Sequence, residues 1–163
     1  MSKQLSGVSG AHFSHCRVYR FALWRQWEVS EPYVLFVGLN PSTADENIDD
    51  PTIRRCKRFA IDWGYGGIVM ANIFAFRATD PKEMLASDNP VGVGNDIWLK
   101  YLAHRAGMVI CAWGAHGKYL NRDKQVCELL DDYPLHCLGT TKGGQPRHPL
   151  YIKADQRPVE FHG

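Results

Sequence analysis

The sequence predicts an α/β fold, a three-layer α/β/α sandwich with a mainly parallel central sheet. Apolar runs of strand length, at 33–39, 67–74, 108–113 and 135–138, alternate with segments whose apolar residues recur at helical spacing. Each of these runs ends abruptly in a polar loop. Helices between successive strands allow right-handed crossovers that keep the strands parallel and place their loops at one edge of the sheet.

The composition is that of one globular domain spanning residues 1–163, with 45% hydrophobic and 22% charged residues. The net charge is only +2, and the five cysteines contain no Cys-x-x-Cys pair, so neither a zinc site nor a disulfide framework is indicated. No apolar run approaches the ~20 residues of a membrane span, and residues 1–10 lack a signal peptide. We expect a cytoplasmic protein with flexible residues 1–12 and without metal, cofactor or membrane partner.

The first half of the chain contains two strands and a helix. Residues 17–27 alternate like a half-buried strand, and Glu31-Pro32 turns the chain into the strand 33–39, which predicts an antiparallel first pair. Asp50 suits a helix N-cap and Pro51 the first helical position. The helix then presents apolar residues at helical spacing up to a stop at Gly64, and these are Ile53, Cys56, Phe59, Ala60 and Trp63.

The second half continues the alternation. After the strand 67–74 we expect a short helix at 82–86 and a helix at 97–106 that is capped by Asn95 or Asp96. The core positions expected in this second helix are Ile97, Leu99, Leu102 and Ala103. The strand 108–113, a helix at 122–130 and the strand 135–138 follow. The glycine-rich polar segment 139–150 then forms a long loop, which in a compact domain is often functional.

Polar residues stand where the predicted strands end. They are Asn40, Asn72, His116 and His148, and we expect them to border one pocket at the carboxyl ends of the strands. Asn72 either bonds a neighbouring loop or offers a donor–acceptor pair that reads the edge of a nucleobase. His148 either binds a ligand or fastens its loop to the sheet. Ser42, beside Pro41, is a weak candidate nucleophile because no Gly-x-Ser-x-Gly elbow is present.

Basic residues cluster after the first polar loop, at Arg54, Arg55, Lys57 and Arg58. They either contact phosphate or form a solvated face that pairs with Asp45, Glu46 and Asp49. We assign phosphate contacts to this cluster and to the basic residues of the last loop, namely to Arg54, Arg55, Arg58, Lys142 and Arg147.

Several stretches resemble a bacterial and phage family catalogued as domain of unknown function 1643. The resemblance covers roughly residues 17–155 and is carried by segments 37–45, 49–56, 72–81, 112–114 and 145–150, among them Gly38-Leu-Asn-Pro41 and Gln145-Pro-Arg-His-Pro-Leu150. It brings little functional information.

A more distant resemblance links the chain to the uracil-DNA glycosylase superfamily. Gly38-Leu-Asn-Pro41 is similar to the Gly-Ile-Asn-Pro motif of its mismatch-specific branch, Cys111-Ala-Trp-Gly-Ala-His116 to a Leu-Trp-Gly-x-His stretch, and His148-Pro-Leu150 to the closing His-Pro-Ser-Pro-Leu motif. The resemblance implies a uracil-DNA glycosylase-like fold. It also implies that Asn40 positions the attacking water, Asn72 reads the base and His148 stabilises the departing base anion.

The remaining substrate contacts are expected among residues of the same loops. We assign them to Gly38, Pro41, Ser42, Arg77 and His116, and expect Phe74 or Phe76 to replace the stacking aromatic that the first motif lacks. Asp45, Asp49 or Asp50 supplies a general base if this loop folds over the site, and we place Asp45 in that role. Alternatively, Asp45 and Asp50 only cap helices and turn the loop.

The function that this sequence supports is a nucleobase N-glycosylase-like hydrolase acting on a base in nucleic acid or in a nucleotide. Two alternatives stay open, a non-catalytic nucleic-acid or nucleotide binding module and an unrelated enzyme chemistry on the same fold. The identity of the base, the choice between polymer and nucleotide, and the oligomeric state are not determined by the sequence.

Overall fold

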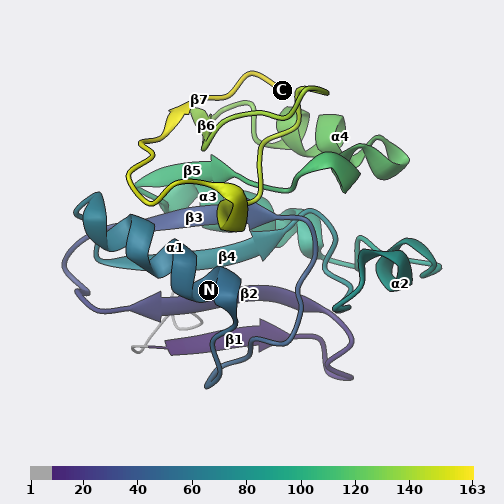
Figure 1. The fold of residues 1–163 in the computed structure, drawn as a ribbon. Helices are drawn as coiled ribbons and strands as arrows, with labels where there is room; N and C mark the ends of the chain where they lie inside the picture. Colours follow the sequence, from purple (N-terminus) through teal and green to yellow (C-terminus); the bar gives the residue numbers. More distant parts are fainter. Residues whose placement is uncertain (1–8) are drawn as a thin grey trace.

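The computed structural model describes residues 9–163, which form an α/β fold around one mixed seven-stranded sheet (Figure 1). In spatial order, the strands are β1 (Ser9–Phe13), β2 (Arg20–Gln26), β4 (Gly67–Asn72), β3 (Tyr33–Gly38), β5 (Met108–Cys111), β6 (Leu135–Cys137) and β7 (Val159–Glu160). β4, β3, β5 and β6 run parallel, whereas β1, β2 and β7 pair antiparallel with their neighbours. The prediction of a mainly parallel sheet is therefore wrong, although the α/β class and the adjacency of β4, β3 and β5 are confirmed.

The pairing of β2 was also predicted wrongly, because β2 lies beside β4 and not beside β3. The connection from β2 passes over the start of β4, where the amides of Trp27 and Glu28 both donate to the carbonyl of Gly66. A Cβ at Gly66 would lie 2.2 Å from the carbonyl oxygen of Glu28. This glycine lets the two backbones approach closely, so the chain can leave room for β4 between β2 and β3.

Two edge strands were not anticipated from the sequence. β1 pairs with β2 from Ser9 onward, so the expectation of flexibility is wrong for residues 9–12. For residues 1–8 that expectation lies outside the described part of the chain. At the opposite edge, the two-residue strand β7 pairs with β6.

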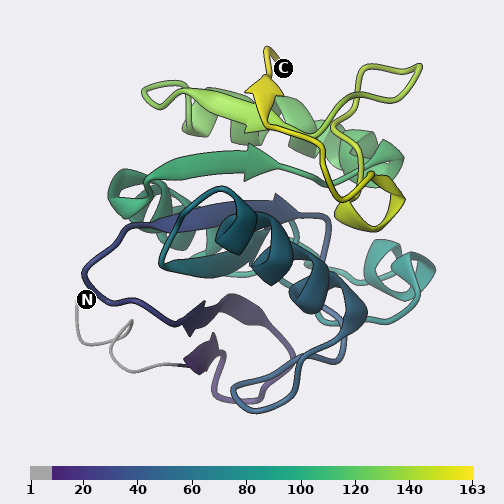
Figure 2. The same cartoon turned by 60° about the vertical axis from the view of Figure 1, so that its left-hand side comes forward.

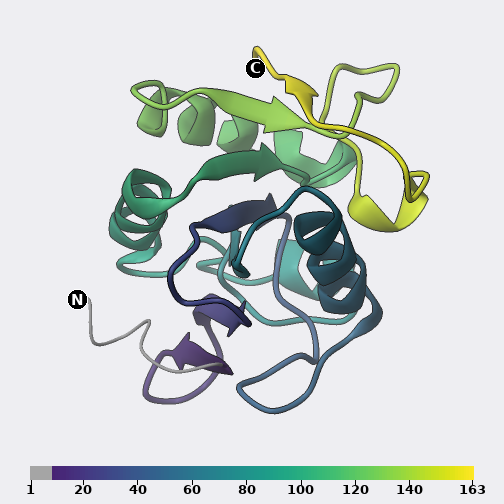
Figure 3. The same cartoon turned by 90° about the vertical axis from the view of Figure 1, so that its left-hand side faces the viewer.

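Helices cover both faces of the sheet, as Figures 2 and 3 show. On one face, α1 (Pro51–Asp62) packs Ile53, Cys56 and Phe59 against Val34, Phe36, Ile68 and Ile110. On the other, α3 (Asn95–Arg105) and α4 (Arg122–Leu129) pack against Leu35, Val37, Val69 and Val109. Alternate residues of each central strand thus enter two separate cores. Shorter helical segments are α2 (Pro81–Leu85), η2 (Ala115–Asn121) and η3 (Pro149–Tyr151).

The ends of the helices follow local chemistry in one case and tertiary contacts in another. Asp50 caps α1 by accepting from the amide of Ile53 at 2.9 Å, with Pro51 at the first helical position, as predicted. The predicted cap of α3 is wrong, because Gly94 occupies that position and Asn95 is buried. Ile97, predicted as core, is 69% exposed.

Within residues 9–163, none of the helices has the length and apolar character that crossing a membrane requires.

Candidate functional site

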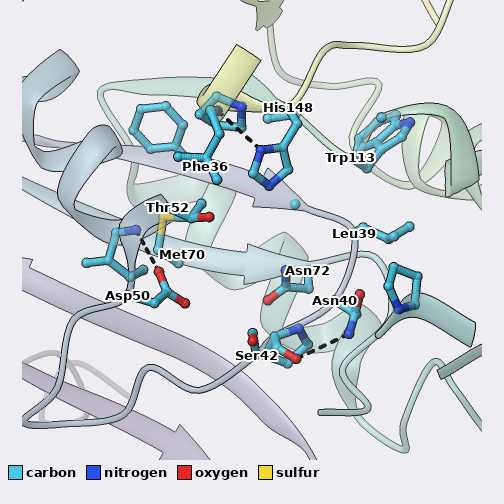
Figure 4. Close-up of a pocket in the computed structure, with 18 of the residues that line it drawn as sticks. Phe36, Leu39, Asn40, Ser42, Asp50, Thr52, Met70, Asn72, Trp113 and His148 are labelled. Carbon is cyan, nitrogen blue, oxygen red and sulfur yellow. Dashed lines mark hydrogen bonds between the residues drawn. The ribbon is translucent and has the colours of Figure 1, made fainter. Parts of the chain in front are cut away.

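A cavity of about 710 Å³ lies on the α1 side of the sheet, at the carboxyl ends of β3, β4 and β5 (Figure 4). Its walls come from the loop after β3, the first turn of α1, the segment after β5, and the segment 148–151. Its volume falls within the roughly 300–1,000 Å³ of small-molecule pockets. The four segments meet here because parallel strands end at one edge of the sheet.

The cavity brings together most of the residues that were predicted to form a site. Asn40, Asn72, His116 and His148, which were expected at the carboxyl ends of the strands, all line it. So do Gly38, Pro41 and Ser42 of the first loop. Their roles still have to be inferred from the contacts that each side chain makes.

Asn40 is held with its carboxamide in one orientation. Its Nδ2 donates to the carbonyl of Ala78 at 2.9 Å and to that of Pro41 at 3.2 Å. Because carbonyl oxygens only accept, the nitrogen of the amide must face them. Asn40 Oδ1 remains as an acceptor, and no hydrogen bond reaches it from the described residues.

Asn72 is held in the same way by Arg20, which the sequence analysis missed. Both side chains are buried, and Arg20 Nη2 donates to Asn72 Oδ1 at 3.3 Å, while Nη1 donates to the carbonyl of Ala44 at 3.2 Å. Burial lowers the pKa of Arg20 to about 10, partly offset by the charge of Asp50, so the guanidinium stays cationic at neutral pH. In a half-buried strand Arg20 falls on the side opposite the apolar residues Tyr19, Phe21 and Leu23, and nothing local indicated that the loop after β3 covers that side.

His148 presents its imidazole to the cavity in a defined state. Its Nδ1 accepts from the backbone amide of Leu150 at 3.2 Å and so caps η3. Burial lowers the pKa of His148, with the charge of Asp50 opposing the shift, and the neutral ring is therefore the main form at pH 7. With Nδ1 accepting, the proton sits on Nε2, which leaves this atom as a donor.

The carboxylate at the site belongs to Asp50 and not to Asp45. Asp45 lies outside the cavity lining, and its Oδ1 accepts from the amides of Asn47 at 2.9 Å and Ile48 at 2.8 Å, two bonds that lower its pKa. The structure therefore does not bring Asp45 into the cavity, and the two bonds of its carboxylate shape the loop. Asp50 lines the cavity while it caps α1 through Oδ1, which leaves Oδ2 available (Figure 4).

Two predicted substrate contacts lie elsewhere. Phe74 is fully buried in the core behind the sheet and packs against Tyr119, so it cannot stack on a ligand. The aromatic residues of the cavity are instead Phe36, Trp113 and the exposed Tyr151. Arg77 lines a neighbouring, more open cavity of about 490 Å³, and its guanidinium lies 4.7 Å from the centroid of Phe13.

None of the predicted phosphate contacts lines the main cavity. Arg54 donates to the carbonyl of Asp49, Arg55 to that of Ile152 and Arg147 to that of Tyr151. Arg58 pairs with Asp62 at 3.3 Å, and Lys142 is exposed. These residues can reach only a ligand that extends beyond the cavity. In the part of the chain that the structure describes, no group of three or more His, Cys, Asp or Glu side chains is placed to hold a metal ion.

Residues 20–150 match the model of a family described as "Protein of unknown function (DUF1643)". The chain belongs to this family. The matched range includes Arg20, Asn40, Asp50, Asn72 and His148, so the DUF1643 region carries nearly the whole wall of the cavity. Comparison with curated proteins and with solved structures found no match.

Proposed function

We propose that this protein hydrolyses the N-glycosidic bond between a nucleobase and its sugar, in nucleic acid or in a nucleotide. The observation that carries the proposal is the fixed polarity of one cavity. Asn40 Oδ1 and Asp50 Oδ2 are acceptors, while Asn72 Nδ2 and His148 Nε2 are donors. Such a set serves a reaction that deprotonates water and stabilises negative charge on a leaving group.

The proposed reaction uses each of these groups once. A water oxygen bonds to the anomeric carbon as the carbon–nitrogen bond breaks, and the bonding electrons leave with the base. Asn40 Oδ1 orients the water and Asp50 accepts its proton. The Nε2–H of His148 and the Nδ2–H of Asn72 donate hydrogen bonds to the base, where negative charge grows. The base anion takes up a proton from solvent, and Asp50 returns its proton to solvent. The products are the free base and a sugar with a hydroxyl group at that carbon.

The shape of the cavity is compatible with a planar ring. Phe36 and Trp113 are among the lining residues, and both side chains are almost fully buried. At its mouth, Tyr151 is 75% exposed and its ring centroid lies 5.8 Å from that of His148. Aromatic surface of this kind stacks on bases without regard to sequence.

A uracil-DNA glycosylase-like arrangement is part of the proposal. Its support is that the segments that resemble the motifs of that superfamily, 38–41, Asn72, 111–116 and 148–150, all contribute to one cavity. Under this proposal, the ligand is a single base drawn into the cavity, with the sugar and phosphate at its mouth.

The test is a panel of oligonucleotides and nucleosides that each carry one normal or modified base, with free base detected by mass spectrometry. We expect release from at least one member. Asn40→Ala and Asp50→Asn should slow this release by about 10²–10⁴-fold. Asp50→Asn is informative because asparagine caps a helix as well as aspartate does, so stability should change little.

Lys124→Ala is the matched control, because Lys124 is exposed on α4, behind the sheet. It should release base at the wild-type rate. Binding of one panel member without any release would refute the catalytic proposal. That outcome would favour the alternative, a non-catalytic binding module.

A further inference from the structure

We infer that the second, more open cavity is a phosphate subsite, built around Arg17 and Arg77, for a ligand whose base occupies the main cavity. This inference rests on the proposed function in one respect, that the ligand of the main cavity is a nucleobase. It adds the place where the phosphate of that ligand is bound.

The second cavity adjoins the main one. Its volume is about 490 Å³, and four residues line both cavities, namely Ser42, Thr43, Ala78 and Thr79. Three of them carry a hydroxyl group, which can donate one hydrogen bond to an anion. A ligand with its base in the main cavity can therefore extend past these residues and place a charged group in the second cavity.

Two cations of this cavity are held close together. The guanidinium carbons of Arg17 and Arg77 lie 3.9 Å and 4.7 Å from the centroid of the same ring, that of Phe13. Arg77 Nη1 also donates to the backbone carbonyl of Arg17 at 3.2 Å. The ring and the carbonyl offset part of the repulsion between the two charges. An anion bound between or beside them offsets more of it.

The acidic residues nearby leave donors of both arginines available. Arg17 Nη2 pairs with Glu46 at 2.9 Å, an exposed contact that leaves Nη1. Among the described residues, Arg77 forms no ion pair, its buried Nε has no hydrogen-bond partner, and its Nη2 is not engaged. Asp45 feels both charges, but two backbone amides of its own loop are the main cause of its low pKa and already bind its carboxylate.

This set of groups fits a phosphate. Guanidinium groups bind phosphate oxygens through two parallel hydrogen bonds, and a phosphate monoester carries about −1.5 to −2 charges at pH 7, which two arginines balance. One group opposes such a ligand, because the exposed carboxylate of Glu83 also lines the cavity. Arg77 and Glu83 therefore make opposite predictions for the same measurement.

Inorganic phosphate is the first probe, because it requires no base. Its binding to the full chain is measured by calorimetry and by the rise in melting temperature, against chloride at equal ionic strength. Arg77→Met should weaken binding about 10–100-fold, as for a lost hydrogen bond to a charged group. Glu83→Gln should strengthen it about two- to fivefold. Lys124→Met, which removes a charge behind the sheet, should have no effect.

Two further variants separate binding from packing. Arg77→Lys keeps the charge without the planar fork and should bind phosphate with intermediate affinity. If Arg77→Met does not fold, Arg17→Met removes the more exposed cation and should weaken binding about threefold or more. No phosphate binding by the wild-type protein, wild-type affinity in a folded Arg77→Met or Arg17→Met, or equal losses in Arg77→Met and Lys124→Met overturns the inference.

The link to the main cavity is tested with nucleosides and their 5′- and 3′-monophosphates. At least one monophosphate should bind about tenfold or more tightly than its nucleoside, and Arg77→Met should remove this gain. The methyl ester of that monophosphate identifies the source of the phosphate. A loss of affinity on esterification indicates a terminal phosphate, and an unchanged affinity indicates a phosphate within a polymer. Equal binding of every nucleoside and its monophosphates overturns the inference.

The outcome is separable from that of the proposed function. Phosphate binding that depends on Arg77, without release of any base, leaves this subsite standing and refutes the glycosylase proposal. Release of a base with equal efficiency from a nucleoside and its monophosphates, by a protein that binds no phosphate, does the reverse.

Discussion

His148 combines two tasks that a substitution can separate. Its Nδ1 caps η3 at the amide of Leu150, and its Nε2 faces the proposed substrate. His148→Asn should keep a cap but lose the donor at the position of Nε2, which its shorter amide does not reach, whereas His148→Ala should lose both. We expect both variants to slow base release by about 10²–10³-fold, the size associated with one preorganised donor. Only His148→Ala should also lose stability, by about 1 kcal/mol.

Single-turnover release and thermal unfolding of the two variants measure these effects. A loss of activity in His148→Ala that His148→Asn restores would assign His148 a structural role only, that of holding its loop.

The pH dependence of stability gives an independent test of the His148 environment. Burial lowers the pKa of His148 below its ordinary value of 6.5. At a pH between the lowered folded-state pKa and 6.5, the unfolded chain binds more protons than the folded protein. Stability should therefore fall as the pH drops below 6.5 and level off below the folded-state pKa. The pKa of the partly buried His12 is lowered as well, but His12 is common to all variants. The wild-type curve minus that of His148→Asn, from urea titrations, therefore isolates His148, and a flat difference would contradict its burial.

Sequence reasoning found side chains whose position along the chain reveals their place in the fold. Asn40, Asn72, His116 and His148 lie near the carboxyl ends of predicted strands or in the loops that follow them, so topology predicted that they would converge. Arg20 was not placed at the site, and Asp50 was only one of three candidates for the general base, with Asp45 preferred. Arg20 lies within a strand and becomes part of the cavity only because residues 40–44 fold across it. Asp50 was predicted as a helix cap, and the structure confirms this role. The same residue also lines the cavity.

At the scale of elements, the segment from Asp45 to Asp50 depends on Arg25 of β2. Arg25 is 7% exposed, and its Nε donates to Asp49 at 2.8 Å while other nitrogens reach the carbonyls of Asp45 and Ile48. Arg25→Met should destabilise the protein by about 3 kcal/mol, the low end for breaking a buried pair, because Lys57 still contacts Asp49. Amide exchange at 45–50 should rise more than elsewhere.

Arg17→Met is the matched control for this prediction, because Arg17 forms an exposed pair with Glu46 at 2.9 Å. Its loss should cost less than about 1 kcal/mol. Equal costs in chemical denaturation, or unchanged exchange at 45–50 in Arg25→Met, would show that Arg25 does not organise this segment.

The strands and helices themselves were predictable where one local signal decided them. Periodicity identified β3, β4, β5 and α1, and Asp50-Pro51 fixed the start of α1. The neighbours of β2 depended on a contact distant in sequence, between Glu28 and Gly66, which no local pattern encodes. Likewise, Ile97 has the spacing of a core residue but points to solvent, because the buried contacts of Asn95 with the carbonyls of Asn72 and Ile73 set the rotation of α3.

At the scale of the whole molecule, the open question is whether the base arrives in a polymer or in a nucleotide. The net charge of +2 is too small for a strong overall field. The basic side chains that could track a polymer lie outside the cavity on α1, whose first turn forms part of its wall. Arg58 is the most informative of them, because its side chain is 71% exposed and its one ion pair, to Asp62, is worth little.

Charge reversal at Arg58 therefore separates the two substrates. If the ligand is a polymer that runs past α1, Arg58→Glu should weaken oligonucleotide binding and reduce its salt dependence by about one unit of slope, because one phosphate contact is lost. Binding of an uncharged nucleoside should not change. Lys124→Glu changes the net charge equally on α4, behind the sheet, and should leave both affinities as they are. If oligonucleotide affinity falls equally in both variants, the effect reflects net charge alone. If it is unchanged in Arg58→Glu, the basic face of α1 is solvated surface, and a nucleotide is favoured as the substrate.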